Sequence, residues 1–107
     1  MTLGQLQDRI RDLYGSKDAR RGVEGTFMWF MEEVGELSAA LRVGAGPEAD
    51  GAARRELALE FADVLAWLAT LANIADVDLD AAVQAKYGGG CPGCGRTPCV
   101  CDQAEKP

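Results

Sequence analysis

Two groups of carboxylates carry the most informative chemistry in this sequence. They are EEVGE at residues 32–36 and EFAD at residues 60–63, and both lie in apolar stretches with helical periodicity. Each group places two acids three residues apart: Glu33 with Glu36, and Glu60 with Asp63. Residues at that spacing project from one side of a helix, about one turn apart. Carboxylates at the edge of a buried face repel each other, and a divalent cation relieves that repulsion.

A metal bound at these acids would have oxygen ligands only. The chain contains no histidine, and hard oxygen ligands favour Mg²⁺ or Mn²⁺ over Zn²⁺. A di-iron carboxylate bundle is disfavoured for the same reason, because it normally uses a Glu-x-x-His motif. An ordinary alternative stays open, since surface helices often carry Glu at this spacing. Two clusters without a basic residue four positions later favour the metal site.

Both tryptophans are expected to lie beside the acids. Trp29 precedes Glu33 by four residues, and Trp67 follows Asp63 by four. Helical geometry then places each indole at the same edge of the apolar stripe as an acidic pair. A flat aromatic substrate could stack on such indoles. The alternative is that both tryptophans belong to the core.

Apolar residues recur at helical spacing through most of the first 87 residues, and no segment alternates like a strand. Capping residues and glycines predict four helices. The first helix begins at a Thr2–Gln5 capping box and stops at Gly15, and residues 15–25 form a loop. Thr26 caps a second helix, which ends in the stretch 43–51. A third helix runs from about Ala52 to Ala75, and Asp78 caps a fourth from Leu79 to Tyr87. The fold class is therefore all-α, with a helical domain over residues 1–87.

Composition predicts how this small domain associates. A helical domain of this size buries only about 60% of its unfolded surface, and 48% of the residues are apolar. A homodimer or homotetramer is therefore expected. The net charge of −6 and the sequence pI near 4.5 count against a nucleic acid polymer as partner.

The beginning of the chain lacks a basic region followed by an apolar one, and no stretch approaches about 18 unbroken apolar residues. We therefore expect no membrane partner and a cytoplasmic location, in which cysteines are reduced by default.

All four cysteines lie in a short segment after Gly88-Gly89-Gly90, within the predicted hinge and tail at residues 88–107. Their pattern, Cys91-x-x-Cys94 and Cys99-x-Cys101, resembles a zinc knuckle, and four thiolates would give a closed structural Zn²⁺ site. The gap between the pairs is shorter than the usual 15–20 residues. Free or redox-active thiols, disulfides and an iron–sulfur centre stay open as alternatives. Catalysis by these cysteines is not expected, because no histidine could activate one.

The acidic motifs, taken together, resemble the signature of the MazG-like nucleoside triphosphate pyrophosphohydrolases, an all-α family. That signature is EExxE followed at a distance by ExxD, and here Glu32-Glu33-x-x-Glu36 precedes Glu60-x-x-Asp63. The sequence around these motifs is also similar to that of the family, in the stretches EEVGELSAALR and LEFADVLAWLATLANIADVDLDAAVQAKY. The resemblance covers most of residues 20–87 and implies a four-helix, oligomeric MazG-like bundle with an added cysteine-rich tail.

By this resemblance the protein is a hydrolase that acts on acid anhydrides, cleaving a nucleotide between its α- and β-phosphates to a monophosphate and pyrophosphate. The family pattern implies that Glu33, Glu36, Glu60 and Asp63 bind Mg²⁺, with Glu32 as a further ligand or a base. Candidate substrate-binding residues are Trp29 and Trp67 for stacking, Lys86, Lys17, Arg20 and Arg21 for phosphate, and Asn73 and Tyr87 for base or sugar. Removal of non-standard or surplus nucleotides is the expected role. The rival hypothesis is a non-enzymatic helical oligomer whose zinc-bearing tail binds a partner.

Overall fold

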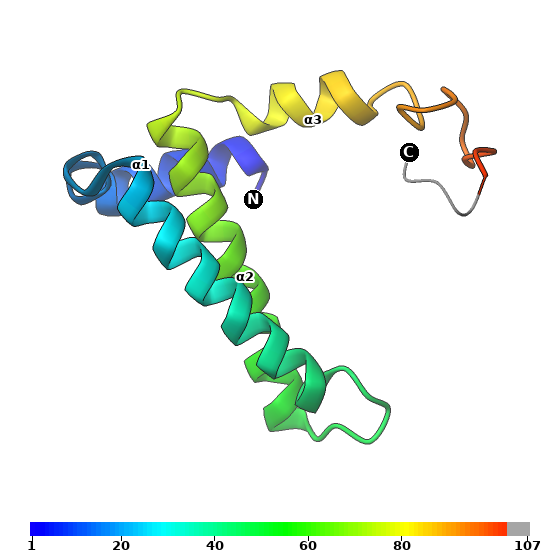
Figure 1. Cartoon of the computed structure of the whole chain (residues 1–107), viewed down its shortest axis with the longest axis horizontal. Coiled ribbons are helices and arrows are strands. Elements are labelled where there is room, and N and C mark those ends of the chain that lie inside the picture. The colour runs from blue at the N-terminus through cyan, green and yellow to red at the C-terminus, as the bar shows by residue number, and fades with distance from the viewer. Residues whose placement is uncertain (103–107) are drawn as a thin grey trace.

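The computed structural model describes residues 1–102 and is helical throughout its regular structure (Figure 1). It contains α1 (Leu3–Gly44), α2 (Gly51–Ile74) and α3 (Leu79–Tyr87). No strand occurs within residues 1–102, which confirms the all-α class. The last part of the predicted tail, residues 103–107, lies outside the described residues.

The first helix differs from the prediction. The expected stop at Gly15 and the loop over residues 15–25 are wrong, because α1 continues to a sharp bend at Gly22 (φ 78°, ψ −177°) and then resumes. Thr26 is not an N-cap: it is fully buried inside α1, and its hydroxyl accepts a hydrogen bond from Arg21 Nε at 3.0 Å. The predicted count of four helices therefore becomes three within residues 1–102, and the first of them is bent.

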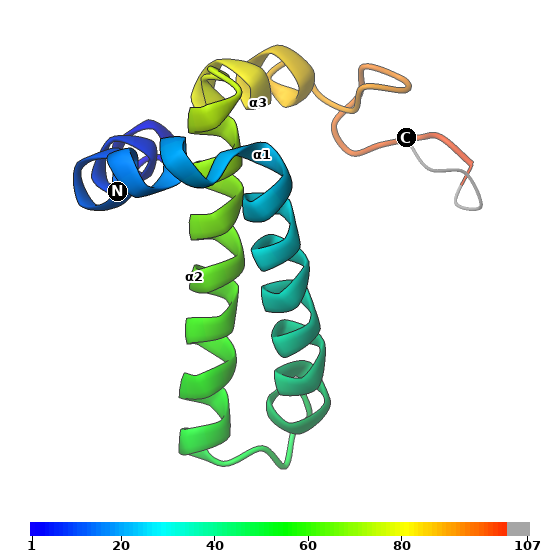
Figure 2. The ribbon, with the colours of Figure 1, turned by 60° about the vertical axis from the view of Figure 1, so that its left-hand side comes forward.

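The bend decides which parts of α1 touch α2. Figures 1 and 2 show that the segment before Gly22 crosses one end of α2, whereas the segment after it runs beside α2. The backbone conformation at Gly22 is essentially restricted to glycine. The bend at Gly22 thus allows the two segments of α1 to contact α2 with different orientations.

Side-chain caps begin all three helices, and two of these caps, Thr2 and Asp78, were predicted from the sequence. Thr2 and Gln5 form the expected capping box. The side chain of Asp50 accepts from Ala53 N at 2.8 Å at the start of α2, and that of Asp78 accepts from Ala81 N at 3.1 Å at the start of α3. Each carboxylate satisfies a backbone donor that the first helical turn leaves free.

A buried glutamine ties α3 to the rest of the chain. Gln7 Nε2 donates to Asn73 Oδ1 at 3.1 Å and to the Val77 carbonyl at 2.7 Å, while Gln7 Oε1 accepts from Leu79 N at 2.9 Å. Asn73 Nδ2 donates back to the Gln7 carbonyl at 3.0 Å. This reciprocal pair joins the first turns of α1 to the junction of α2 and α3.

Much apolar surface lies open on the single chain. The accessible area is 7789 Å², whereas a compact monomer of this mass exposes about 5,800 Å². The radius of gyration is 16.6 Å, against about 13 Å for a compact chain of this length. Exposed large apolar side chains on the paired helices include Phe27, Met28, Met31, Leu59, Phe61, Leu65 and Leu68.

By length and composition alone, α2 is apolar enough to cross a membrane. It packs along α1, however, and carries Glu60 and Asp63 near its middle. Charged side chains in the middle of a bilayer are costly. Only 22% of the apolar window of α2 is buried in the single chain.

Two glycines test the bent helix. We expect Gly22→Ala to lower the free energy of unfolding by about 1–3 kcal/mol, because its φ of 78° strains any other residue. We expect Gly15→Ala to raise that free energy by up to about 1 kcal/mol, since Gly15 lies inside the helix and an added Cβ meets only Arg11 Cγ at 3.4 Å. Denaturant unfolding followed by circular dichroism measures both. A destabilising Gly15→Ala would favour the loop that the sequence predicted.

Candidate functional site

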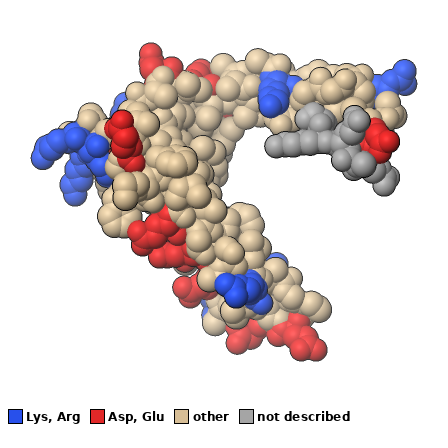
Figure 3. Space-filling model, viewed as in Figure 1, with Lys and Arg blue, Asp and Glu red and all other residues tan. Residues whose placement is uncertain are grey.

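Three acids from two helices meet between α1 and α2. Glu33 and Glu36 come from α1 and Glu60 from α2, and each offers one carboxylate oxygen, all within 4.8 Å of one another. Glu33 and Glu60 are half-buried, whereas Glu36 is exposed. Figure 3 shows acidic side chains gathered over the middle of this helix pair. The three-residue spacing of Glu33 and Glu36 on one helix face places both opposite Glu60.

The buried oxygens of this cluster lack partners. Glu33 Oε2 and Glu60 Oε2 are inaccessible to solvent and have no hydrogen-bond partner within residues 1–102. Burial raises the pKa of Glu33, and the neighbouring Glu36 and Asp63 raise it further, while a side-chain hydrogen bond with Trp67 partly lowers it. Burial likewise raises the pKa of Glu60, followed by Glu36, Asp63 and Glu33. Buried carboxylate oxygens without hydrogen-bond donors are unfavourable, and a bound cation would relieve that cost.

The two remaining acids of the motifs stand at the border of this cluster. Asp63 is exposed and does not belong to the group of three within 4.8 Å, yet it is close enough to raise the pKa of both Glu33 and Glu60. Glu32 is exposed and also raises the pKa of Glu33. Of the four predicted metal ligands, the structure thus groups three and places Asp63 beside them. Their roles as ligands stay predictions.

A pocket of about 370 Å³ adjoins the acids on the side of Asp63. Its walls combine an indole, a phenol and two cations with apolar side chains. The lining residues are Ile10, Tyr14, Lys17, Asp18, Arg21, Asp63, Ala66, Trp67 and Thr70. A flat ring and an anion could both find complementary groups there.

The tryptophans lie together instead of forming two separate platforms. The rings of Trp29 and Trp67 stack with centroids 6.4 Å apart and an interplanar angle of 19°. The guanidinium of Arg21 lies 4.8 Å from the centroid of the Trp67 ring. Trp67 lines the pocket, whereas Trp29 supports it from α1. Arg21, Trp67 and Trp29 thus connect three segments: α1 before the bend, α2, and α1 after the bend.

Sequence reasoning missed several residues in this region because it read residues 15–25 as a loop. Asp18 is buried and forms an ion pair with Arg21, and its Oδ2 has no hydrogen-bond partner among the residues that the structure describes. Tyr14 lines the same pocket as Asp18. The signal was present in the chain, because Ile10, Tyr14, Lys17 and Arg21 recur at helical spacing. Basic side chains gather near this bend in Figure 3.

A second hollow, of about 440 Å³, lies on the other side of the acids. Glu36 and Glu60 line it together with Glu56 and small or apolar residues of α1 and α2. Glu56 also raises the pKa of Glu60. The acid cluster therefore lies between two pockets, one rich in alanine and one that contains Trp67, Lys17 and Arg21.

Three predicted substrate-binding residues lie apart from these pockets. Both polar atoms of the Asn73 side-chain amide are engaged, by Gln7 and by Arg11 Nη2 at 3.0 Å, which is the behaviour of a residue that fixes the end of a helix. Lys86 and Tyr87 are exposed at the end of α3, with the Lys86 ammonium 5.7 Å from the Tyr87 ring centroid. Neither lines a pocket beside the acids. Their contact with substrate stays a prediction.

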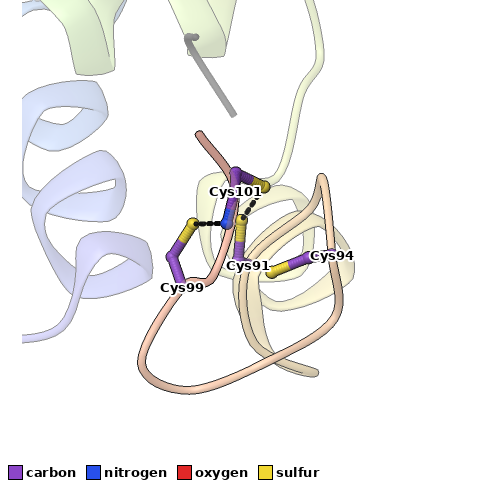
Figure 4. A group of neighbouring side chains, drawn as sticks. All are labelled: Cys91, Cys94, Cys99 and Cys101. Atoms are coloured by element: carbon purple, nitrogen blue, oxygen red, sulfur yellow. Dashed lines mark hydrogen bonds between the residues drawn. The ribbon is translucent and has the colours of Figure 1, made fainter. Parts of the chain in front are cut away.

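The four cysteines form a cluster of their own in the tail. One sulfur from each of Cys91, Cys94, Cys99 and Cys101 lies within 4.8 Å of the others (Figure 4). Backbone hydrogen bonds from Val100 and Arg96 lower the pKa of Cys94 to about 6. The neighbouring thiols raise the pKa of Cys101 to about 12. The short gap between the two pairs therefore does not keep them apart.

A protein-family model matches the part of the chain that contains these acids. The family model described as the MazG nucleotide pyrophosphohydrolase domain matches residues 21–92, which is more than half of the chain. No curated protein and no solved structure matches this chain. The matched region contains the resumed part of α1, all of α2 and α3, and every acid of the cluster. The chain belongs to the MazG nucleotide pyrophosphohydrolase family.

Proposed function

We propose that this protein hydrolyses nucleoside triphosphates, ribo or deoxy, between the α- and β-phosphates in a Mg²⁺-dependent reaction, releasing a nucleoside monophosphate and pyrophosphate. Removal of surplus or non-standard nucleotides in the cytoplasm would be its role. The observation that carries the proposal is the group of Glu33, Glu36 and Glu60, whose carboxylate oxygens approach within 4.8 Å.

The donors at this site suit Mg²⁺. Two of them have buried oxygens without hydrogen-bond partners among the described residues, all are carboxylates, and such hard oxygen ligands are those that Mg²⁺ and Mn²⁺ select. Glu33, Glu36 and Glu60 would hold the ion, and Asp63 lies close enough to join them. When bound, Mg²⁺ would neutralise phosphate charge and acidify water.

The protein's own residues would position the substrate and take up a proton. In the proposed reaction the oxygen of a water attacks the α-phosphorus, the bond from that phosphorus to the bridging oxygen breaks, and pyrophosphate leaves with the bond's electrons. Glu32, exposed beside Glu33, would accept the proton that the water loses. Most of the catalytic effect would come from orientation and charge neutralisation.

The neighbouring pocket would hold the rest of the nucleotide. Trp67 lines this pocket and would contact the base, and Lys17 and Arg21 bring positive charge to a strongly acidic protein. Arg21 is already oriented by Asp18 and Thr26. This arrangement allows one molecule to contact Trp67 and the acid cluster at once, because Asp63 borders both.

We also propose that the chain assembles as a homodimer or homotetramer through its apolar helix faces. Phe61, Leu65 and Leu68 are exposed at positions i, i+4 and i+7 of α2 and form one stripe. The chain exposes about 2,000 Å² more than a compact monomer would, an area within the range that obligate interfaces bury.

The acid cluster is tested by charge removal at constant shape. We expect Glu36→Gln and Glu60→Gln each to lower pyrophosphate release at least about 100-fold, because each removes a ligand charge that the transition state needs. Helical content should not change. The matched controls Glu24→Gln and Glu48→Gln, both exposed and outside the cluster, should keep full turnover.

Turnover is best screened across nucleoside di- and triphosphates, with and without Mg²⁺. Full activity in both cluster variants would disprove the carboxylate site. Cation binding by the wild type without turnover on any nucleotide would instead favour the rival, a non-enzymatic helical oligomer.

The raised pKa values predict a pH dependence of stability. The folded metal-free protein holds protons on Glu33 and Glu60 more tightly than the unfolded chain, whose carboxyls have the ordinary value of 4.5. This contribution to stability is present below pH 4.5 and is lost as the pH rises through the raised values. Thermal melts from pH 4 to pH 8 measure it.

Mg²⁺ should reverse that loss near neutral pH, because an ion that binds only the folded state stabilises it by RT ln(1 + [L]/Kd). A Glu33→Gln/Glu60→Gln double variant should show neither the loss above pH 4.5 nor the Mg²⁺ effect. An equal Mg²⁺ effect in that variant would place the cation elsewhere.

The apolar stripe is tested by a charge. We expect the wild type to elute as a dimer or larger assembly of the 11.4 kDa chain, and Leu65→Lys to shift it toward monomer, because a buried unpaired ammonium is unfavourable. Val100→Lys, on the exposed tail, is the control. Light scattering coupled to size exclusion measures the mass, and a monomeric wild type would contradict the assembly.

A further inference from the structure

The cysteine cluster lies in a segment that has no apolar core. Within residues 88–102 no residue is buried, and the large apolar side chain of Val100 is 65% exposed. A segment that buries so little apolar surface cannot offset its own ordering entropy. The converging cysteine side chains in Figure 4 are the main candidates to hold it together.

The sulfur positions fit a tetrahedral metal. Four thiolates around Zn²⁺, each about 2.3 Å from the ion, lie about 3.8 Å from one another. The sulfurs of Cys91 and Cys101 are 3.9 Å apart, and all four fall within 4.8 Å. Bonded sulfurs would be separated by only about 2.05 Å. The four thiols are free in this structure, and their spacing allows all four to bind one shared ion.

Backbone amides support the sulfurs as they would in such a site. Gly93 N donates to Cys91 Sγ at 3.4 Å, Val100 N to Cys94 Sγ at 3.5 Å, and Cys101 N to Cys99 Sγ at 3.3 Å. Donors aimed at sulfur favour the thiolate, which is the form that binds metal. Three of the four sulfurs therefore have an N–H donor.

Glycines shape the turn around the cluster. Cys91 N donates to the Arg96 carbonyl at 3.1 Å and Gly95 N to the Cys91 carbonyl at 2.6 Å, so the segment folds back on itself. Gly90 has a φ of 108°, and a Cβ there would lie 2.9 Å from the Gly95 carbonyl oxygen. Only glycine at position 90 allows the backbone on the two sides of the turn to approach this closely.

We propose that Cys91, Cys94, Cys99 and Cys101 bind one Zn²⁺ in a closed structural site, distinct from the carboxylate cluster, and that this ion orders the tail. Thiolates select Zn²⁺, whereas the carboxylates select Mg²⁺. The two donor sets differ in every ligand, so each metal has its own site. A closed tetrahedron has no open position for substrate, which gives the ion a structural role.

Metal analysis of the full chain, purified without chelator, tests the stoichiometry. We expect about one Zn²⁺ per chain, thiols that resist alkylation until the protein is denatured, and a Co²⁺-substituted protein with the strong visible absorption of a tetrahedral thiolate site. Cys94→Ser should lose the stoichiometric zinc while α1 and α2 keep their helical signal. Exchange with a chromogenic chelator gives the affinity.

Two adjacent glycines provide a matched pair that leaves every ligand in place. Gly90→Ala should weaken zinc binding by roughly tenfold or more, because its positive φ and the Gly95 carbonyl both oppose a Cβ. Gly89→Ala, where a Cβ meets no described residue within 4 Å, should bind zinc like the wild type. Equal affinities in the two variants would contradict the turn described here.

Other outcomes would overturn the proposal. Native protein without zinc and with four freely titratable thiols would assign the cysteines to redox chemistry. Disulfides found by mass spectrometry, or iron with inorganic sulfide, would assign them to those alternatives. Zinc retained at full stoichiometry in Cys94→Ser would place the ion elsewhere.

Discussion

One unfavourable interaction constrains the whole structure, the mutual repulsion of acids. The packing of α1 against α2 places these acids together in a partly buried position. Packing the two helices brings Glu33, Glu36 and Glu60 within metal-binding distance and leaves the Oε2 atoms of Glu33 and Glu60 without donors in the described chain. Apolar contact between the helices must outweigh that cost. The same helix pair leaves a stripe of apolar side chains exposed on α2, and the proposed function assigns this stripe to contact between copies of the chain.

Local signals in the sequence were sufficient for most of the secondary structure. Thr2 and Asp78 cap the helices that they were predicted to cap, because a capping hydrogen bond involves residues only three apart. The fold class and the family follow from patterns of the same kind. The motifs predicted one site for Glu33, Glu36, Glu60 and Asp63, and the structure groups the first three with Asp63 beside them.

The bend of α1 could not be predicted in that way. Residues 15–25 contain glycines and charged residues that resemble a loop, and their helical form rests on contacts with distant residues. Asp18 is buried, Arg21 lies over the Trp67 ring, and Thr26 is covered completely. Tertiary packing therefore overrides local preference in this stretch, and the pocket that it forms with α2 was missed for the same reason.

The continuity of α1 between Gly22 and Gly44 has a consequence for how this domain can change in length. Thr26 and Glu33 lie on one unbroken helical stretch that follows the bend at Gly22, so their relative direction is set by residue count. One inserted residue would advance the later part of the helix by about 1.5 Å and rotate it by about 100°, turning the acids away from Glu60. Insertions are compatible with the site in the connection between α1 and α2, where residues 45–50 are not helical. The number of residues in this helix therefore fixes the position of the acids, and insertions or deletions should be tolerated only at the ends of the helix.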